Sequence, residues 1–193
     1  MFTGIIEAQA RIIDITESGI ILSKPESFTD LTIGASISVS GVCLSVTSFD
    51  DTSISFDVVQ ETKDRSTLGA KNQGDMVNLE RSVRADQRMD GHTVQGHVEG
   101  VGELISLEEG VLRLKMPERL NKFCVQKGSI AIDGVSLTIA DIKGDNVSVA
   151  LVPHTLENTT FGSLKAGYFV NIETDIIGRY LYAFTHEEAT HQG

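Results

Sequence analysis

The sequence predicts an all-β protein made of two tandem domains of one fold, followed by a short C-terminal helix. Two observations support this: an internal duplication, and a succession of short segments in which polar and apolar residues alternate. Short strands separated by Gly, Asp and Asn are typical of barrels and sandwiches. We place the domains at residues 1–88 and 89–175, with the helix and tail at 176–193.

The duplication extends without a gap over about forty-five positions. Residues 36–46 return as residues 129–139, and this offset of 93 residues (129 − 36) holds through Glu80 and Glu173. Each half has fewer than 100 residues and buries only a modest core, so we expect the halves or the subunits to contact each other.

The two copies differ mainly at side chains that can take part in chemistry. Turn glycines, apolar positions and several threonines are repeated. The positions that differ are Ser40 and Asp133, Cys43 and Ser136, and Glu61 and His154. Two copies of one surface with different reactive groups indicate a protein that handles two like molecules in unlike roles.

The first strands are predicted from residues 36–47, where the apolar residues change parity at Gly41. This change predicts a bulge or sharp bend at Gly41, repeated at Gly134. If Val42 and the apolar residues that follow at spacing two point into a barrel, the residues between them point out. The expected outward residues are Cys43 and Ser45 in the first half, and Ser136 and Thr138 in the second.

Helical signals are sparser. Residues 117–124 begin with proline and predict a helix with that proline in its first turn. Residues 176–184 space apolar residues at helical intervals. The resulting stripe of Ile176, Tyr180, Leu181 and Phe184 has no evident partner within the chain, so we expect it to contact another subunit.

Composition excludes several classes of function. The net charge of −11 is spread without a basic cluster, which argues against nucleic acid as a partner. Two cysteines without a CxxC motif, and the lack of an apolar leader or spanning segment, predict a reduced cytoplasmic protein that does not enter a membrane. His92 and His97 lie on opposite faces of a strand and lack a third ligand, so we expect no metal and a structural role for His92.

Eight ordered motifs resemble the riboflavin synthase family along nearly the whole chain. They are MFTGIIE (1–7), GVCLSV (41–46), ET (61–62), VNLER (77–81), GHTVQGHV (91–98), KG (127–128), DGVSLT (133–138) and PHT (153–155). The resemblance implies two six-stranded antiparallel Greek-key barrels and a homotrimer formed through the C-terminal helix. It also implies an active site between the N-terminal barrel of one subunit and the C-terminal barrel of its neighbour.

The activity implied by the resemblance needs no cofactor. Two molecules of 6,7-dimethyl-8-ribityllumazine dismutate, and one gives a four-carbon unit to the other. The products are riboflavin and 5-amino-6-ribitylaminouracil. Association with the lumazine-forming enzyme, lumazine synthase, is left open.

The resemblance also implies two sets of ligand-binding residues. The first molecule is expected at Gly4, Ile5, Ile6, Cys43, Leu44, Ser45, Asp57, Val58, Val59, Gln60, Glu61 and Thr62. The second is expected at Gly96, His97, Val98, Ser136, Leu137, Thr138, Ala150, Leu151, Val152, Pro153, His154 and Thr155. Lys127 is expected to reach a ligand from the adjoining chain.

The candidate catalytic residues are few. Histidine is the side chain best suited to moving protons near neutral pH, which favours His97, and Ser136, with Asp133 three residues earlier, is the expected partner in the second half. Cys43 could add to C7 of one lumazine, and a water molecule could do the same. The alternative function is a non-enzymatic protein that binds lumazine or flavin on the same fold. A barrel that binds proteins or oligonucleotides is disfavoured by the acidic composition and the lack of exposed stacking aromatics.

Overall fold

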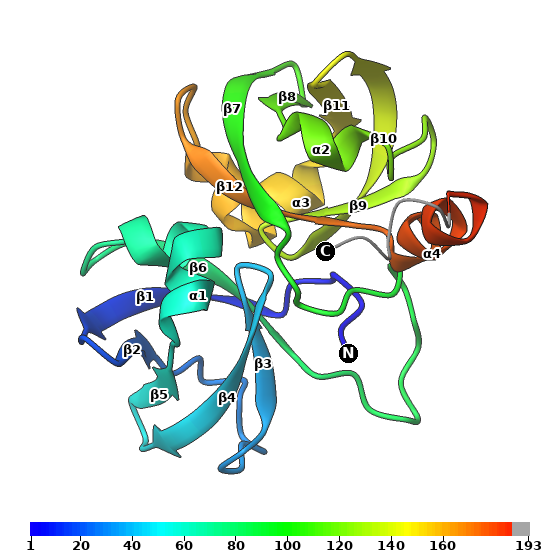
Figure 1. Cartoon of the computed structure of the whole chain (residues 1–193). Helices are drawn as coiled ribbons and strands as arrows, with labels where there is room; N and C mark the ends of the chain where they lie inside the picture. The colour runs from blue at the N-terminus through cyan, green and yellow to red at the C-terminus, as the bar shows by residue number, and fades with distance from the viewer. Residues whose placement is uncertain (187–193) are drawn as a thin grey trace.

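The computed structural model describes residues 1–186, which form two closed barrels and a C-terminal helix (Figure 1). The tail at 187–193 lies outside the described residues. All strand pairs within the barrels are antiparallel, and each barrel has six strands. The predicted all-β class and the two six-stranded barrels are therefore confirmed.

The first barrel has the strand order β1-β2-β5-β4-β3-β6. Its strands are β1 (Ala8–Ile15), β2 (Gly19–Ser23), β3 (Ser36–Val39), β4 (Val42–Phe49), β5 (Ser53–Asp57) and β6 (Met76–Arg81). Between β5 and β6 lie α1 (Gln60–Arg65) and the 3-10 helix η1 (Thr67–Ala70).

The second barrel repeats this plan in the order β10-β11-β8-β7-β12-β9. Its strands are β7 (Gly100–Glu108), β8 (Val111–Lys115), β9 (Ser129–Ile132), β10 (Val135–Lys143), β11 (Asn146–Ala150) and β12 (Phe169–Thr174). Its helices are α2 (Glu118–Asn121), α3 (Pro153–Asn158) and η2 (Thr160–Ser163), and α4 (Ile176–Thr185) follows β12.

Each barrel encloses its own core of aliphatic and aromatic side chains. On β4, Val42, Leu44 and Val46 are buried, whereas Cys43 is half-buried and Ser45 exposed. On β10 the same alternation buries the apolar residues and leaves Ser136 half-buried and Thr138 exposed. Burying an aliphatic side chain stabilises the fold by roughly 1.5–3 kcal/mol, which favours this register over one shifted by a single residue. The predicted outward direction of the polar residues is confirmed.

Gly41 does not form a bulge but lies in a sharp bend, the other form that the change of parity predicted. Ser40 and Gly41 form a two-residue hairpin turn between β3 and β4, and both have positive φ, 46° and 84°. Asp133 and Gly134 repeat the turn with φ of 45° and 80°. The parity changes at Gly41 because the chain reverses there, and a two-residue turn with positive φ at both positions matches the twist of the strands.

The two hairpin turns pack against each other at the contact between the barrels. A Cβ at Gly41 would lie 2.8 Å from the backbone nitrogen of Gly134, so only glycine allows this approach. Asn78 on β6 donates from Nδ2 to the carbonyl of Asp133 (3.0 Å), and Asn171 on β12 donates to the carbonyl of Ser40 (2.8 Å). The halves are thus joined by reciprocal, buried hydrogen bonds.

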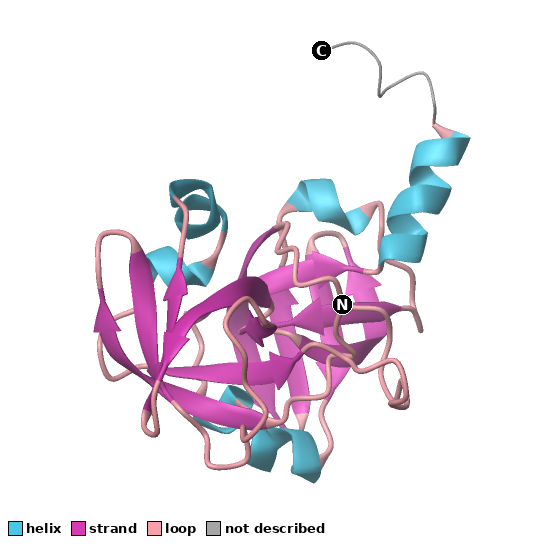
Figure 2. Ribbon diagram, turned by 90° about the horizontal axis from the view of Figure 1, so that it is seen from below, coloured by secondary structure: helices cyan, strands magenta, loops and turns pink. Residues whose placement is uncertain are grey.

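The helices differ from expectation in two details. α2 is shorter than residues 117–124, and Pro117 is its N-cap because ψ of 124° at that residue is not helical. α4 projects from the second barrel (Figure 2), and its N-cap is Asp175, whose carboxylate accepts from the N–H of Ile177 (3.0 Å). No helix in residues 1–186 combines the length and apolarity that a membrane span requires.

One side of α4 packs on the second barrel and the other side is exposed. The ring edge of Tyr182 meets Phe123, with centroids 5.3 Å apart. The exposed apolar residues are Ile177, Tyr180, Leu181 and Phe184, each at least 60% exposed. Ile176, which the sequence placed in the stripe, is half-buried, and Ile177 lies on the exposed face in its place.

Candidate functional site

Two short segments cross between the barrels. Phe2 and Val94 exchange both backbone hydrogen bonds, at 2.7 and 3.1 Å. Two residues further along each segment, the carbonyl of Gly4 accepts from the N–H of Ser136, and that of Gly96 accepts from the N–H of Cys43, both at 2.8 Å. The N-terminal segment therefore lies on β10 of the second barrel, and the segment before β7 lies on β4 of the first.

This crossing corrects the grouping expected from the sequence. Gly96, His97 and Val98 belong with Cys43, and Gly4, Ile5 and Ile6 belong with Ser136. Val98 packs against the core of the first barrel, and Ile6 packs against the core of the second. The observed contacts differ from the expected grouping because a repeated sequence does not indicate which copy of a barrel each crossing segment covers.

Both crossing segments need glycine at the point of contact. Gly4 and Gly96 have φ of 76° and 80°, in the left-handed region that favours glycine. A Cβ at Gly96 would lie 2.6 Å from the Cβ of Cys43, and one at Gly4 would lie 2.6 Å from the Cβ of Ser136. The two side chains that differ between the repeats are therefore each covered by a glycine backbone.

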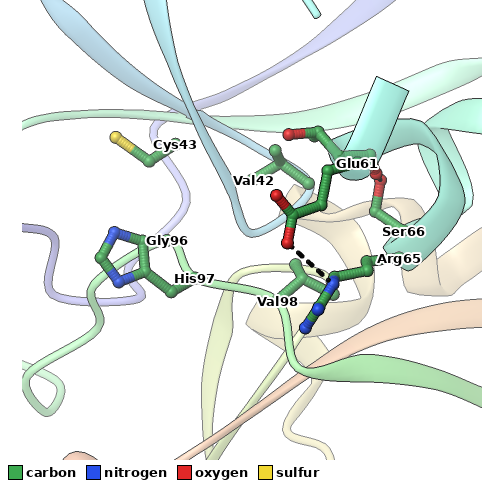
Figure 3. A pocket seen from close by; sticks show the side chains of 9 residues that line it. Val42, Cys43, Glu61, Arg65, Ser66, Gly96, His97 and Val98 are labelled. Atoms are coloured by element: carbon green, nitrogen blue, oxygen red, sulfur yellow. Dashed lines mark hydrogen bonds and ion pairs between the residues drawn. The ribbon is translucent and has the colours of Figure 1, made fainter. Parts of the chain in front are cut away.

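The first barrel carries a cavity of about 260 Å³ on its outer surface, between β4, α1 and the crossing segment (Figure 3). Cys43 and His97 lie at one end, and Glu61 and Arg65 lie at the other, joined by an ion pair of 3.2 Å between Nε and Oε1. The full lining is Val42, Cys43, Glu61, Thr62, Arg65, Ser66, Gly96, His97 and Val98. A sulfur and an imidazole at one end, with charged groups at the other, suit an elongated ligand that has a flat part and a polar chain.

Arg65 is a lining residue that the sequence analysis missed. It lies four residues after Glu61, so one turn of α1 brings the two side chains together. That spacing was visible in the sequence. The matching pair in the second half is His154 and Asn158, which form a contact of 3.1 Å on α3.

The remaining expected ligand residues fall into two groups. Leu44, Val58, Leu137 and Leu151 are buried, so only their backbone groups can face a ligand. The other residues lie at the surface or are half-buried. Ser45, Asp57, Val59 and Gln60 are exposed but do not line the first pocket, and Thr138, Ala150, Val152, Pro153 and Thr155 belong to the second barrel and α3. Lys127 lies before β9 with φ of 67°, where the first repeat has Gly34.

Ser136 has a histidine partner that the sequence analysis treated as structural. The Nδ1 atom of His92 lies 2.7 Å from Oγ of Ser136. Burial lowers the pKa of His92 below its ordinary value, and the nearby charge of Asp175 opposes this shift. The neutral imidazole that results can accept the proton of the serine hydroxyl. His92 was missed because its contact with Ser136 depends on the crossing of the chain.

Asp133 does not pair with Ser136 as expected. Its side chain is buried in the hairpin turn, where Oδ1 accepts from the N–H of Asn171 at 2.7 Å. Burial raises the pKa of this carboxyl to about 6, while the hydrogen bond from Asn171 and the charge of Lys71 act in the opposite direction. In the first repeat Ser40 accepts from the N–H of Asn78 in the same way (3.1 Å), so the position serves the turn.

The raised pKa of Asp133 gives a stability prediction. The folded state binds this proton more tightly than the unfolded state, so ionisation lowers the free energy of unfolding as the pH rises through about 6. Asn keeps the accepting oxygen and tolerates positive φ. We expect Asp133→Asn to raise the free energy of unfolding by roughly 1–3 kcal/mol above pH 6 and to have little effect near pH 4.

Urea unfolding between pH 4 and pH 8 measures this difference. Asp51→Asn, at an exposed carboxyl, is the control and should follow the parent protein at every pH. A difference between Asp133→Asn and the parent that does not change with pH would show that ionisation of Asp133 does not affect folding.

Comparisons with known proteins give a matching family model, sequence relatives and similar solved structures. The lumazine binding domain model matches twice, at residues 3–82 and 95–175. The chain is 41% identical to a riboflavin synthase of Bacillus subtilis over 97% of this chain and 91% of that protein. It is 38% identical to one of Mycobacterium tuberculosis over 94% and 96%. The crystal structure of LumP complexed with riboflavin has a TM-score of 0.81 at 27% identity, covering 90% of this chain and 99% of that one.

Proposed function

The chain belongs to the riboflavin synthase family, and on that premise we propose how its two pockets divide one reaction between them. The reaction converts two molecules of 6,7-dimethyl-8-ribityllumazine into riboflavin and 5-amino-6-ribitylaminouracil. A four-carbon unit passes from one molecule to the other, so the atoms balance without an external oxidant or reductant. The observation that carries the proposal is that the same surface occurs twice with different reactive pairs, Cys43 with His97 and Ser136 with His92.

In the first barrel the lumazine ring lies at the Cys43 and His97 end of the cavity. The peptide groups of residues 96–98 and of β4 supply alternating donors and acceptors for the edge of the ring. The ribityl chain extends towards Glu61, Thr62 and Arg65, which can bind its hydroxyls. The charged groups at the far end of the cavity support this orientation.

In the second barrel the ring lies against residues 4–6 and β10, close to Ser136. The ribityl chain follows α3, where His154 and Thr155 occupy the positions of Glu61 and Thr62. This pocket therefore has an imidazole where the first has a carboxylate. Two such pockets can hold the same ligand in different protonation and hydrogen-bonding environments, as a donor and an acceptor of one unit require.

The chemistry needs few groups. The C7 methyl of the lumazine is acidic because its anion delocalises into the ring, so a base and correct positioning are the main requirements. The neutral imidazole of His92 takes the methyl proton through the hydroxyl of Ser136. At the other molecule a nucleophile adds at C7. Either Cys43 or a water molecule held beside His97 can serve, and the bond to this nucleophile breaks again when the four-carbon unit is transferred.

Assembly is part of this proposal. The exposed apolar face of α4, formed by Ile177, Tyr180, Leu181 and Phe184, binds a neighbouring subunit. In the resulting homotrimer the first barrel of one subunit faces the second barrel of the next, and Lys127 reaches the shared ligand. Residues 1–88 and 89–175 are the two domains. The protein acts in the cytoplasm, where its two free cysteines stay reduced. Association with lumazine synthase stays a prediction.

The test is a direct assay. Purified protein is mixed with 6,7-dimethyl-8-ribityllumazine without any cofactor, and riboflavin is followed by its absorbance and fluorescence. We expect one riboflavin for every two lumazines consumed. Ligand binding without turnover would instead favour a non-enzymatic lumazine or flavin carrier, the function class suggested by the complexes of LumP.

A further inference from the structure

Two buried carboxylates hold the crossing segments. Glu80 on β6 and Glu173 on β12 occupy matching positions of the repeat, and each is only 3% exposed. No ion pair with Lys or Arg involves either one within residues 1–186. Burying an ionised carboxylate is costly unless several hydrogen bonds offset the loss of hydration. These two residues therefore need an explanation beyond the packing of a barrel.

Their partners are mostly consecutive backbone N–H groups. The carboxylate of Glu173 accepts from the N–H groups of Gln95 (2.7 Å), Gly96 (2.9 Å) and His97 (2.9 Å). That of Glu80 accepts from the N–H (2.6 Å) and the hydroxyl (2.8 Å) of Thr3, and from the N–H of Gly4 (2.9 Å). Only an ionised carboxylate offers two oxygens that accept and never donate.

Each carboxylate acts across the boundary between the barrels. Glu173 belongs to the second barrel, yet the segment it holds covers Cys43 of the first barrel through the hydrogen bond from Cys43 to Gly96. Glu80 belongs to the first barrel, yet its segment covers Ser136 of the second. Cys43 and Ser136 are thus each covered by a segment whose anchor lies in the opposite barrel.

We propose that Glu173 and Glu80 are positioning residues of the reaction, each holding the segment that completes the pocket of the opposite barrel. Glu173 sets His97 beside Cys43, and Glu80 sets Gly4 against Ser136. The inference rests on the proposed function for its catalytic meaning, but the positioning itself can be measured without substrate. It also gives a reason for the duplication, because neither pocket is complete without a carboxylate of the other copy.

The test uses thiols as local reporters. In a Cys124→Ser background, Cys43 is alkylated with iodoacetamide, in which the thiolate displaces iodide, and the rate is measured by mass spectrometry. Cys124 is replaced so that Cys43 is the one thiol that iodoacetamide can label. Burial already raises the pKa of the Cys124 thiol to about 11, which slows its reaction. We expect Glu173→Gln to raise the alkylation rate of Cys43 about tenfold, because the amide NH₂ repels an N–H donor and releases the segment. We expect Glu80→Gln to change it by less than about twofold.

The repeat supplies the reciprocal experiment. Ser136→Cys is introduced into a chain that also carries Cys43→Ser and Cys124→Ser, which moves the reporter to the second barrel. The dependence should now reverse: Glu80→Gln accelerates labelling of the introduced thiol about tenfold, and Glu173→Gln leaves it within about twofold. Both Gln variants lose similar contacts and are expected to lose similar thermal stability, so stability alone does not predict this crossed pattern.

Equal acceleration by both variants at both reporters would mean general loosening and would overturn the proposal, as would no change at either. If a Gln variant does not fold, the Asp variants Glu173→Asp and Glu80→Asp keep the charge, shorten the reach and should show the same crossed pattern with smaller changes. In the protein that carries none of the cysteine substitutions, Glu173→Gln should lower kcat more than it raises KM. A crossed labelling pattern in a protein that makes no riboflavin would support the positioning and refute the proposed reaction.

Discussion

Ser136→Ala is expected to lower kcat for riboflavin formation about a hundredfold or more, with lumazine affinity within about threefold of the parent. The hydroxyl lies 2.7 Å from Nδ1 of His92 and can pass a proton to it, so its removal is expected to affect proton transfer more than ring contact. Stopped-flow or steady-state assays give kcat, and quenching of lumazine fluorescence gives the dissociation constant. Ser148→Ala, on β11 and lining a different cavity, is the matched control and should keep kcat within about twofold.

The dependence of kcat on pH tests the same pair independently. Because burial lowers the pKa of His92, the imidazole stays neutral to a pH below its ordinary value near 6.5. Activity should therefore fall on the acid side only below that pH, as the imidazole becomes protonated and can no longer accept from Ser136. His92→Gln should remove this acid limb and lower kcat.

A loss of affinity as large as the loss of turnover in Ser136→Ala would show that the serine binds the ring and does not move protons.

The second large effect concerns assembly. We expect the double substitution Leu181→Glu with Phe184→Glu to give a mainly monomeric protein that has lost most of its activity, because both side chains lie on the exposed face of α4. The substitutions leave the packing of Tyr182 on Phe123 intact, which deletion of the whole helix would disturb. Sedimentation velocity gives the mass, and the riboflavin assay gives the activity.

Subunit mixing decides whether sites are shared. A Cys43→Ala chain and a Ser136→Ala chain are each expected to be impaired, and they are unfolded and refolded together in equal amounts. If each site joins two neighbouring subunits, about one quarter of the sites regain both intact halves, and turnover should rise to about that share of the parent. If Cys43→Ala alone keeps activity, His97→Ala replaces it. A mixture no more active than its parts would place each site within one chain.

The sequence by itself determined the features that depend on local spacing. The duplication and its offset were visible directly, and strand period alone placed Cys43 and Ser136 on the outer faces of the barrels, where the structure has them. The approximate position of the C-terminal helix also followed from its apolar spacing. Each of these depends on residues that are neighbours in the chain, so that alternation, turn residues and helical periodicity were sufficient to predict them.

The tertiary structure decided which barrel each crossing segment covers. The crossing of residues 2–6 and 94–98 exchanged the expected ligand groups, brought His92 to Ser136 and took Asp133 away from it. A duplicated sequence carries the same local signals in both copies. The sequence therefore cannot distinguish a segment that packs on its own barrel from one that packs on the other barrel. The choice is made by long-range contacts, chiefly the buried hydrogen bonds of Glu80 and Glu173 and the close backbone approaches at Gly4 and Gly96, which exist only once both barrels have folded against each other.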